Sequence, residues 1–306
     1  MSDSWPVRVW EAADADAVGA LLDPGASAVW RTQFHTLHGP DPEPPGWGRT
    51  VVATMPGDNR SVVGAASIIR NRLHPSHYVG GVEVALGRRR RGLGTALLAG
   101  LLRARTDGRP IAAKVSPADG AASAFVRRAG GRIYQRCPGV VVDPRSAEVM
   151  AWARGTGSGA GELVELGTFG RERLAEWYAE QYRWVHRAWS PVGDEKLLRD
   201  VVAQQLDDLD EQLSTGVRLG SHMAATAYCF RERDGHRVVV AETLSPVQPD
   251  GEALVGATIA AVLARAAAGG ISEIEFDGHV DDPHLAPVVS SLPAMRLRPL
   301  DLIEVS

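Results

Sequence analysis

The sequence predicts an α/β (α+β) protein with two tandem domains, each a mixed, mostly antiparallel sheet flanked by helices. Strand-like and helix-like segments alternate along the 306 residues, and the order strand, helices, β-hairpin, helix, strand occurs once in each half. A run of glycines and other small residues from 155 to 161 separates the halves. We therefore expect domains at 1–150 and 162–306, joined by a linker at 151–161.

The first half begins with a short apolar strand and a helix. A proline-rich loop follows, and two β-rich runs then flank the sequence Pro56-Gly57-Asp58-Asn59, which is typical of a hairpin turn. Strand and helix alternate twice more before two short strands close the domain. The expected strands are 7–10, 50–55, 61–70, 82–86, 110–115, 131–134 and 140–142, and the expected helices are 15–22, 94–105 and 119–129.

The second half starts afresh with a strand and a long aromatic helix. Pro191 ends that helix and Asp194 begins the next, because proline cannot continue a helix and aspartate caps one well. A hairpin is expected around Asp234-Gly235, followed by a helix that ends at Gly269-Gly270. The expected strands are 163–166, 223–231, 237–244 and 271–276, and the expected helices are 171–189, 194–213 and 252–268.

Composition excludes several classes of protein. A net charge of −4 argues against a general nucleic-acid-binding surface, which needs a basic balance. The first residues lack the regions of a secretory signal, and the most apolar stretch, 253–268, is interrupted by Gly256 and Arg265 and is too short for a membrane span. Cys137 and Cys229 form no CxxC motif and indicate a reducing compartment. We expect a soluble, cytoplasmic protein.

One segment carries recognisable chemistry: a strand ends at about Leu86, a glycine- and arginine-rich turn follows, and a helix begins at about Gly94. Free N–H groups and the positive dipole end at a helix start bind anions, and glycines let phosphate oxygens approach the backbone. Arginines add charge-assisted contacts. The segment predicts a pyrophosphate site; the alternative is a solvated basic turn that only caps a structural helix. The expected contact residues are Arg89, Arg90, Arg91, Gly92, Leu93, Gly94 and Thr95.

Two signatures in this half resemble the GNAT superfamily of N-acetyltransferases. Arg89-Arg-Arg-Gly92-Leu-Gly94 fits the family's R/Q-x-x-G-x-G/A acyl-CoA motif, and the stretch from Asp119 to Gly131 is similar to its N-x-x-A-x-x-F-Y-x-x-x-G-F helix and turn. The resemblance implies two tandem GNAT-like domains, with acetyl-CoA as acyl donor bound in the N-terminal one. It implies further cofactor contacts from Val84, Ala85, Leu86, Asp119, Ser123, Phe125 and Arg128.

The resemblance also implies direct transfer, in which a neutral amine attacks the thioester. A backbone N–H near Ala85 is expected to stabilise the negative charge that develops on the carbonyl oxygen. A base must take the amine proton, and Glu83 is the candidate because it points away from the apolar side of its strand. The alternative for Glu83 is an ordinary glutamate that faces solvent.

The general acid is harder to assign. The tyrosine that often follows the family's phenylalanine is Val126 here, so the proton for the departing thiolate must come from another group or from water. Tyr134 and Ser123 are the nearest candidates, and Tyr134 is taken as the catalytic one.

The matching strand-to-helix turn of the second half lacks arginines and carries Asp250 and Glu252 instead. These carboxylates suit a helix N-terminus and repel a pyrophosphate for the same reason. We expect the C-terminal domain to keep the fold, to lose the cofactor, and to act as a scaffold or help to shape the acceptor pocket.

Histidines and aromatic residues are mostly assigned structural roles. His35 with His38 and His74 with His77 form H-x-x-H pairs, but a zinc site needs three or four converging ligands, so no metal is expected. The aromatic residues of the helix at 171–189 fit either a packed face or a wall of the acceptor pocket. The aromatic residues expected to border the acceptor in the first half are Trp30, Phe34 and Trp47.

These features together predict an N-acetyltransferase that moves an acetyl group from acetyl-CoA to an amine of a small molecule, such as an antibiotic or a secondary-metabolite intermediate. Two alternatives stay open. One is an acyl-CoA-binding sensor or scaffold without turnover; the other is transfer to a cysteinyl amine as in mycothiol synthase, where the second half is the catalytic one. No nucleic-acid or membrane partner is expected, and the sequence predicts no particular oligomeric state.

Overall fold

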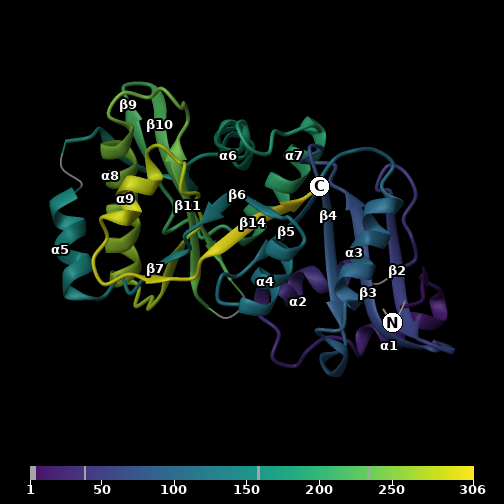
Figure 1. The fold of residues 1–306 in the computed structure, drawn as a ribbon. Helices are drawn as coiled ribbons and strands as arrows, with labels where there is room; N and C mark the ends of the chain where they lie inside the picture. The colour runs from purple at the N-terminus through teal and green to yellow at the C-terminus, as the bar shows by residue number, and fades with distance from the viewer. Residues whose placement is uncertain (1–4, 38, 157–158, 233–234) are drawn as a thin grey trace. The chain divides into compact units, whose positions relative to one another are not determined.

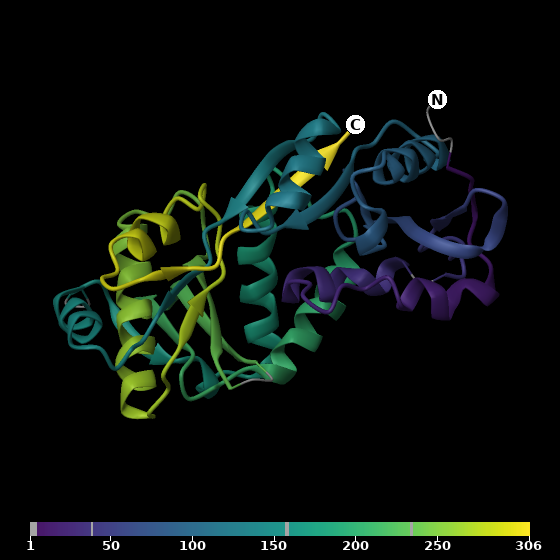
Figure 2. The same cartoon turned by 60° about the horizontal axis from the view of Figure 1, so that its bottom comes forward.

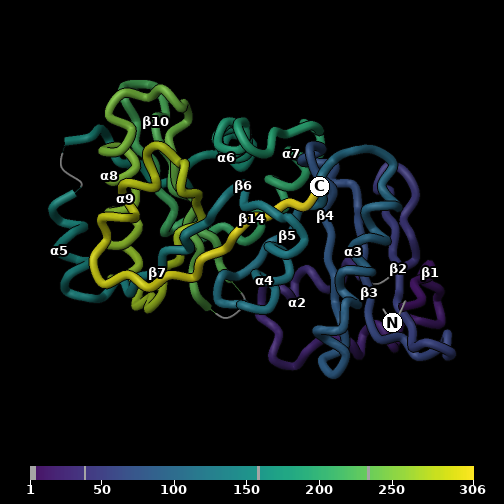
Figure 3. The backbone as a smooth tube through the Cα atoms, viewed as in Figure 1, coloured from purple at the N-terminus to yellow at the C-terminus, as the bar shows by residue number. Residues whose placement is uncertain are grey.

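The computed structural model describes residues 5–37, 39–156, 159–232 and 235–306. Contacts divide the chain into two compact units, Met1–Tyr134 with Asp301–Ser306, and Gln135–Leu300. Figure 1 shows each unit as a sheet with helices packed on it, and Figure 3 traces the same path as a tube. The predicted class, two mixed and mostly antiparallel sheets flanked by helices, is confirmed.

The first unit contains a seven-stranded sheet in the order β1-β2-β3-β4-β5-β14-β6, in which β4 and β5 run parallel. Its strands are β1 (Val7–Val9), β2 (Gly48–Met55), β3 (Asp58–Arg70), β4 (Tyr78–Val84), β5 (Ile111–Val115), β14 (Leu300–Val305) and β6 (Arg132–Cys137). Its helices are α1 (Ala15–Gly19), α2 (Ala28–Phe34), α3 (Leu93–Ala104) and α4 (Gly120–Arg128), with short 3₁₀ helices η1 (Ala12–Asp14), η2 (His35–Leu37) and η3 (Leu86–Arg88).

Helices cover both faces of this sheet (Figure 2). α3 lies on one face, where Leu93, Leu97 and Leu101 recur every four residues and are buried against β2, β3 and β4. α1 and α2 lie on the other face, where Val18 and Phe34 are buried. The strand ends that build the site below are therefore held between two apolar cores.

The second unit contains a second seven-stranded sheet, in the order β13-β7-β12-β11-β10-β9-β8, in which β11 and β12 run parallel. Its strands are β7 (Val140–Val142), β8 (Glu162–Glu165), β9 (Thr215–Leu219), β10 (His222–Arg231), β11 (Arg237–Thr243), β12 (Ile274–Phe276) and β13 (Arg296–Leu297). Its helices are α5 (Ala147–Thr156), α6 (Arg171–His186), α7 (Glu195–Gln205), α8 (Gly251–Ala268) and α9 (Leu285–Ser290), with 3₁₀ helices η4 (Leu166–Thr168) and η5 (Leu206–Asp208).

Helix α8 forms the core of the second unit. Among the described residues it is the one helix long and apolar enough to span a membrane, and most of it is buried inside the protein. It packs on β9, β10 and β11 and also contacts α5 and α9. These contacts explain its apolar character, as expected from the sequence for a buried helix.

The two sheets exchange strands. β14, from the C-terminus, lies between β5 and β6 in the first sheet, and β7, from the first half of the sequence, lies between β12 and β13 in the second. The two sheets otherwise follow the same order, with β7 and β14 in exchanged positions. Each unit therefore depends on a strand from the other half of the chain.

This exchange changes the expected domain boundaries. The division at 1–150, 151–161 and 162–306 follows the chain continuously, whereas contacts assign 135–150 to the second unit and 301–306 to the first. The expected linker also begins inside α5, and its residues 157–158 lie outside the described residues. Continuous sequence ranges cannot represent exchanged strands, which is why the boundaries differ.

Several other elements differ from expectation, and α5, α9 and β9 also form where the sequence predicts no element. Helix α2 and the following η2 form at 28–37, where the sequence predicts no element. Strand β4 begins at Tyr78, well before the expected 82–86. Helix α7 ends at Gln205, before the expected end at 213, and η5 follows it directly. The hairpin β10–β11 is present, and its expected turn residue Asp234 lies outside the described residues.

Candidate functional site

A gap between two parallel strands is the main feature of the first unit. In the described part of the chain, β4 and β5 pair only at Tyr78 with Ile111 and Val79 with Ala112. Beyond these pairs β4 continues to Val84 without β5 as a partner. The unpaired strand ends leave backbone N–H and C=O groups that a ligand or a side chain must satisfy.

The start of α3 lies next in sequence to this gap. Gly92, its N-cap residue, has a left-handed φ of +80° and offers no side-chain cap, and Arg90 also has a positive φ of +66°. The first N–H groups of a helix have no acceptor within it, so those at Leu93, Gly94 and Thr95 are open to an anion. A Cβ on Gly92 would meet no atom within 4 Å, so the space in front of this turn is clear.

Gly94 connects the two sequence signatures in space. A Cβ built on Gly94 would lie 3.2 Å from Cε2 of Phe125, which is tighter than ordinary contact. The glycine of the first signature and the phenylalanine of the second therefore pack together. In this structure Gly94 is needed for the close approach of α3 and α4.

The arginines of the turn divide into two groups. The Arg89 guanidinium donates to the Val84 carbonyl (3.0 Å) and lies 3.1 Å from the Glu83 carboxylate and 3.4 Å from that of Asp23. Arg90 and Arg91 are exposed and form no ion pair with the described residues. Arg89 therefore holds the end of β4, and the exposed cationic side chains of the turn are those of Arg90 and Arg91.

The carboxylate of Glu83 is buried, with 5% of the residue exposed, so the alternative of a solvent-facing glutamate is wrong. Its Oε2 accepts from the indole N–H of Trp30 at 2.6 Å. Its Oε1 accepts from the backbone N–H of Val84 at 2.9 Å and from Arg89. Glu83 thus accepts from three donors, one of which is a cation.

Helix α2, which the sequence did not predict, spans the gap with two side chains. Trp30 reaches β4 through Glu83, and its ring lies so close to Gly81 that a Cβ there would be 2.8 Å from Cη2. One turn later the Gln33 amide donates to the Lys114 carbonyl (2.9 Å) and accepts from the Lys114 N–H (3.0 Å) on β5. Gln33 therefore satisfies strand groups that β4 leaves unpaired.

The backbone N–H that faces the gap belongs to Val84 and not, as expected, to Ala85. The N–H of Ala85 bonds to the Val63 carbonyl at 2.9 Å, so the sheet already uses it. The N–H of Val84 points away from β3 and bonds to Glu83. Val84 is therefore the donor on the side of the gap, and Leu86, which is mostly exposed, follows at the rim.

Tyr134 lies far from Glu83. Its ring stacks on His77 with centroids 4.7 Å apart, and His77 in turn bonds to Glu304 at 2.6 Å. His77 precedes the first residue of β4, and Glu83 is six residues later, or about 20 Å at the rise of a β-strand. The structure does not bring these two catalytic candidates together.

The remaining candidates belong to α4. Asp119 is its N-cap, and its Oδ1 accepts from the N–H groups of Ala121 and Ala122. Ser123 is half-buried, and Arg128 is exposed in the last turn. Asp119 therefore caps α4, whereas Ser123 and Arg128 have no capping role in this helix.

The second unit has an equivalent glutamate in a different environment. Glu242 pairs across to Thr226 as Glu83 pairs to Ala65, and it accepts from the following N–H, that of Thr243, at 2.7 Å. Here, however, the other side-chain partner is His284, whose Nδ1 lies 2.7 Å from Oε1, and Oε2 accepts from the Leu285 N–H at 3.1 Å. Burial raises the pKa of the Glu242 carboxyl, against the lowering effect of the Thr243 N–H and of His284.

His284 also covers the start of α8. A Cβ on Gly251, the first residue of that helix, would lie 2.4 Å from Cδ2 of the His284 ring. Asp250 stands at the N-cap position, but its side chain caps no N–H, contrary to expectation. The helix start that would be open to an anion is therefore packed against a histidine.

The histidines bind separate carboxylates. His77 pairs with Glu304, His279 with Asp282, and His284 with Glu242. The described residues contain no group of three or more side chains that could hold a metal ion, and His38, from one of the H-x-x-H pairs, lies outside them.

Comparison with known proteins places this geometry in a fold family. No protein-family model and no curated protein sequence matches the chain. Among solved structures, a GCN5-related N-acetyltransferase from Sphaerobacter thermophilus aligns over 99% of this chain and 96% of its own, with 15% identity and a TM-score of 0.59.

Two further structures agree. A tandem GNAT protein from the clavulanic acid biosynthesis pathway aligns over 98% of each chain, with 19% identity and a TM-score of 0.59. A GCN5-related N-acetyltransferase from Anabaena variabilis covers 98% of this chain and 72% of its own, with 14% identity and a TM-score of 0.53. This chain therefore has the fold of the GCN5-related N-acetyltransferases, in the tandem arrangement.

Proposed function

We propose that this protein is an N-acetyltransferase that uses acetyl-CoA and acts on an amine of a small molecule, with its active site in the first unit. The observation that carries the proposal is the uncapped start of α3 beside the gap between β4 and β5. An anion-binding helix start and unpaired strand groups are both needed to hold a long phosphorylated thioester. A cytoplasmic location stays a prediction from the sequence.

The first turn of α3 supplies the contacts to the pyrophosphate. The N–H groups of Leu93, Gly94 and Thr95 have no acceptor in the helix, and Arg90 and Arg91 add positive charge nearby. Phe125 fixes the position of α3 against α4 through Gly94. Acetyl-CoA itself supplies an acyl group that is activated as a thioester.

Glu83 and Val84 carry the chemistry on the protein side. Glu83 is a buried carboxylate at the gap end of β4, and it takes the proton that the attacking amine releases. When Glu83 turns from the Val84 N–H, that N–H becomes a donor for negative charge on the carbonyl oxygen. When Oε1 leaves the Val84 N–H, the hydrogen bond from Trp30 to Oε2 still holds the carboxylate.

The test is a calorimetric titration of acetyl-CoA into the whole protein, read for stoichiometry. We expect one site per chain. Thr95→Glu adds a negative charge at an exposed position in the first turn of α3. A negative charge suits the N-terminus of a helix but repels a pyrophosphate. This variant should weaken binding at least about tenfold, as expected for the loss of about 1.4 kcal/mol.

The second unit provides the matched control. Ala253 holds the same position in α8 as Thr95 in α3 and is exposed, so Ala253→Glu should leave acetyl-CoA binding unchanged. Equal losses in both variants, or two sites per chain, would mean that the cofactor is not confined to the first unit. No binding at all would reject the acetyltransferase proposal.

A sensor or scaffold that binds acyl-CoA without turnover is the second candidate. It is favoured by the three hydrogen bonds that hold Glu83 and by Val126 at the place of the usual tyrosine. Release of free CoA that depends on an added amine supports the enzyme, whereas tight binding without release across a broad amine panel supports the sensor. Transfer by the second unit is disfavoured because His284 covers the start of α8.

A further inference from the structure

A hollow of about 500 Å³ lies in the second unit, outside the site described above. One wall is a single face of α6 together with Phe169, which lies two residues before the helix. The wall residues Phe169, Arg173, Trp177 and Glu180 are spaced by four, four and three positions. The facing wall comes from the start of β10 and from the segment after β11. This volume is in the range of small-molecule sites.

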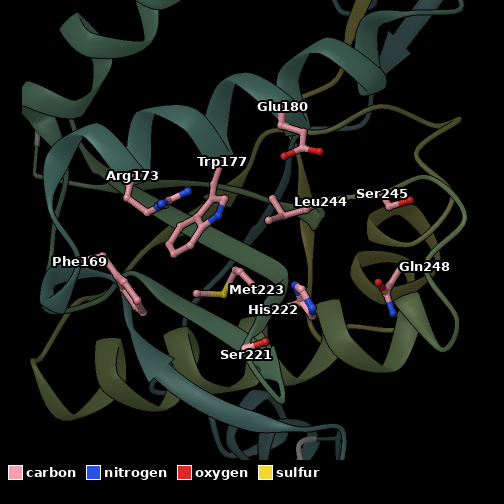
Figure 4. Close-up of a pocket in the computed structure, with 10 residues that line it drawn as sticks. All are labelled: Phe169, Arg173, Trp177, Glu180, Ser221, His222, Met223, Leu244, Ser245 and Gln248. Atoms are coloured by element: carbon pink, nitrogen blue, oxygen red, sulfur yellow. The ribbon is translucent and has the colours of Figure 1, made fainter.

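The wall on the α6 side of the hollow is aromatic (Figure 4). The rings of Phe169 and Trp177 meet edge to face with centroids 5.0 Å apart. Met223, which is almost completely buried, lies across from Trp177 on the other side of the hollow. The surface suits the hydrocarbon or ring of a ligand.

The two side chains of fixed charge that line the hollow, Arg173 and Glu180, differ in their ion pairs. The Arg173 guanidinium is already paired with Glu176 at 2.8 Å and lies 5.9 Å from the centre of the Trp177 ring. Glu180 forms no ion pair with the described residues, because Arg183, the nearby cation on α6, is held by Glu195 at 2.9 Å. The uncompensated charge on this wall is therefore negative.

Arg173 does not cancel that charge. It lies seven residues before Glu180 on α6, or about 10 Å along the helix axis. The guanidinium already lies over the Trp177 ring, so this ring suits the apolar body of a ligand, and the charge of the ligand is left to Glu180. An aromatic surface next to a free carboxylate is the combination that binds organic cations.

We propose that this hollow is a non-catalytic binding site for an organic cation, a protonated amine with an apolar or aromatic body. Trp177 and Phe169 hold the body, and Glu180 pairs with the ammonium group. The neighbouring start of α8, packed against His284, leaves the hollow without an anion site for acyl-CoA beside it. The second unit would thus bind an amine that it does not acetylate. The inference does not depend on transferase activity in the first unit.

The test titrates 2-phenylethylamine into the whole protein without acyl-CoA, with 2-phenylethanol and 3-phenylpropionate as neutral and anionic probes. The amine should bind at least about tenfold more tightly than either probe, because only its charge can pair with Glu180. Glu180→Gln should remove this preference, and Trp177→Leu should weaken binding of the amine and of the neutral probe.

Two variants identify the site. Glu172→Gln removes an exposed carboxylate from the same helix that does not line the hollow, so it should leave amine binding unchanged. Glu83→Gln should also leave it unchanged. No amine binding, no preference over the neutral probe, equal losses in Glu172→Gln and Glu180→Gln, or loss only in Glu83→Gln would each overturn the proposal. Because acetyl-CoA binding is measured separately, failure here and failure of the acetyltransferase proposal are distinguishable.

Discussion

At the scale of residues, the end of β4 is held by hydrogen bonds from a few individual groups. Trp30, Arg89 and the Val84 N–H all point at one buried carboxylate, that of Glu83. A buried charge needs such partners, because removing one leaves the others without compensation. Trp30 is the partner from another element, so it links α2 to the strand and positions the candidate base.

Replacing Trp30 by phenylalanine tests this link. Trp30→Phe keeps an aromatic ring on Gly81 but removes the 2.6 Å hydrogen bond to Glu83. We expect the free energy of unfolding to fall by about 2 kcal/mol, the usual effect of losing a hydrogen bond to a charged group. We also expect kcat/KM to fall at least about tenfold with little change in the affinity for acetyl-CoA, since the base is misplaced and the helix start is not.

Trp10→Phe is the matched control. The indole N–H of Trp10 is buried and has no hydrogen-bond partner among the described residues, so its removal should cost much less. Urea unfolding and steady-state kinetics measure both effects. Equal losses in the two variants would show that ring packing, and not the bond to Glu83, sets the phenotype.

Gly94 is the second residue whose role can be isolated. Alanine normally stabilises a helix relative to glycine by up to about 1 kcal/mol. At Gly100 of α3 a Cβ would make an ordinary contact, 3.5 Å from Val7, so Gly100→Ala should stabilise the protein. At Gly94 the Cβ would press on Phe125 at 3.2 Å, and Gly94→Ala should instead destabilise it by about 1 kcal/mol.

A second substitution separates packing from helix propensity. Phe125→Leu removes the ring that Gly94→Ala would press on, so the double variant should lose less stability than the two single variants added together. Thermal unfolding of the four proteins completes this cycle. Strict additivity would contradict the packing argument, as would a stabilised Gly94→Ala.

At the scale of elements, the exchange of β7 and β14 is what the sequence could not predict. Local patterns identify a strand but not its neighbours, and hydrogen bonding between β14 and β5 joins residues almost 200 positions apart, as Asp301 with Val115. Helix α2 escaped prediction because its pattern is short and lies next to a proline-rich loop. The α3 turn was predicted well, because its glycines, its arginines and the helix start lie together in the sequence.

The strand β14 lies at the end of the chain, yet its side chains should contribute strongly to the free energy of unfolding. Ile303 of β14 is buried in the core of the first unit, whereas Ile133 of β6, the neighbouring strand, is 41% exposed. Ile303→Ala should cost about 2–4 kcal/mol and Ile133→Ala less than about 1 kcal/mol. Chemical unfolding measures both, and similar losses would argue against β14 as an inner strand.

Deleting residues 301–306 extends the same test. If β14 completes the first sheet, this short deletion should abolish acetyl-CoA binding in the first unit, although the deleted residues lie more than 200 positions after the α3 turn. Retained binding after the deletion would mean that the first sheet folds without its exchanged strand.

At the scale of the whole molecule, the sequence predicts two copies of one fold, of which only the first binds acetyl-CoA. The structure shows a difference between the helix starts of the two units. The two units carry equivalent glutamates at equivalent strand ends. In the first unit the next helix start is open and flanked by arginines, and in the second it is covered by His284. His284 lies far from Gly251 in sequence, so the charges at Asp250 and Glu252 were the only available signal. Asp250 does not cap the helix as expected, and the loss of the cofactor from this unit stays a prediction.

The stability of the second unit should depend on pH through a buried histidine, His279. Burial by itself would lower the pKa of His279, but its hydrogen bonds with the Asp282 carboxylate and with Cys137 outweigh burial and raise the pKa to about 10. The folded protein thus holds this proton more tightly than the unfolded chain, whose histidines titrate near 6.5. The stabilisation is fully present below about pH 6.5 and is lost as the pH rises through the folded value.

We therefore expect the free energy of unfolding of the second unit to fall between about pH 7 and pH 10. His279→Gln should flatten this decline, whereas His222→Gln, at an exposed position on β10, should not. Calorimetry is the suitable measurement, because a protein with two compact units can unfold in two transitions and only one should move with pH. A decline of the same slope in His279→Gln would show that other buried groups, such as Tyr178 and Tyr228, whose pKa values burial also raises, dominate the alkaline response.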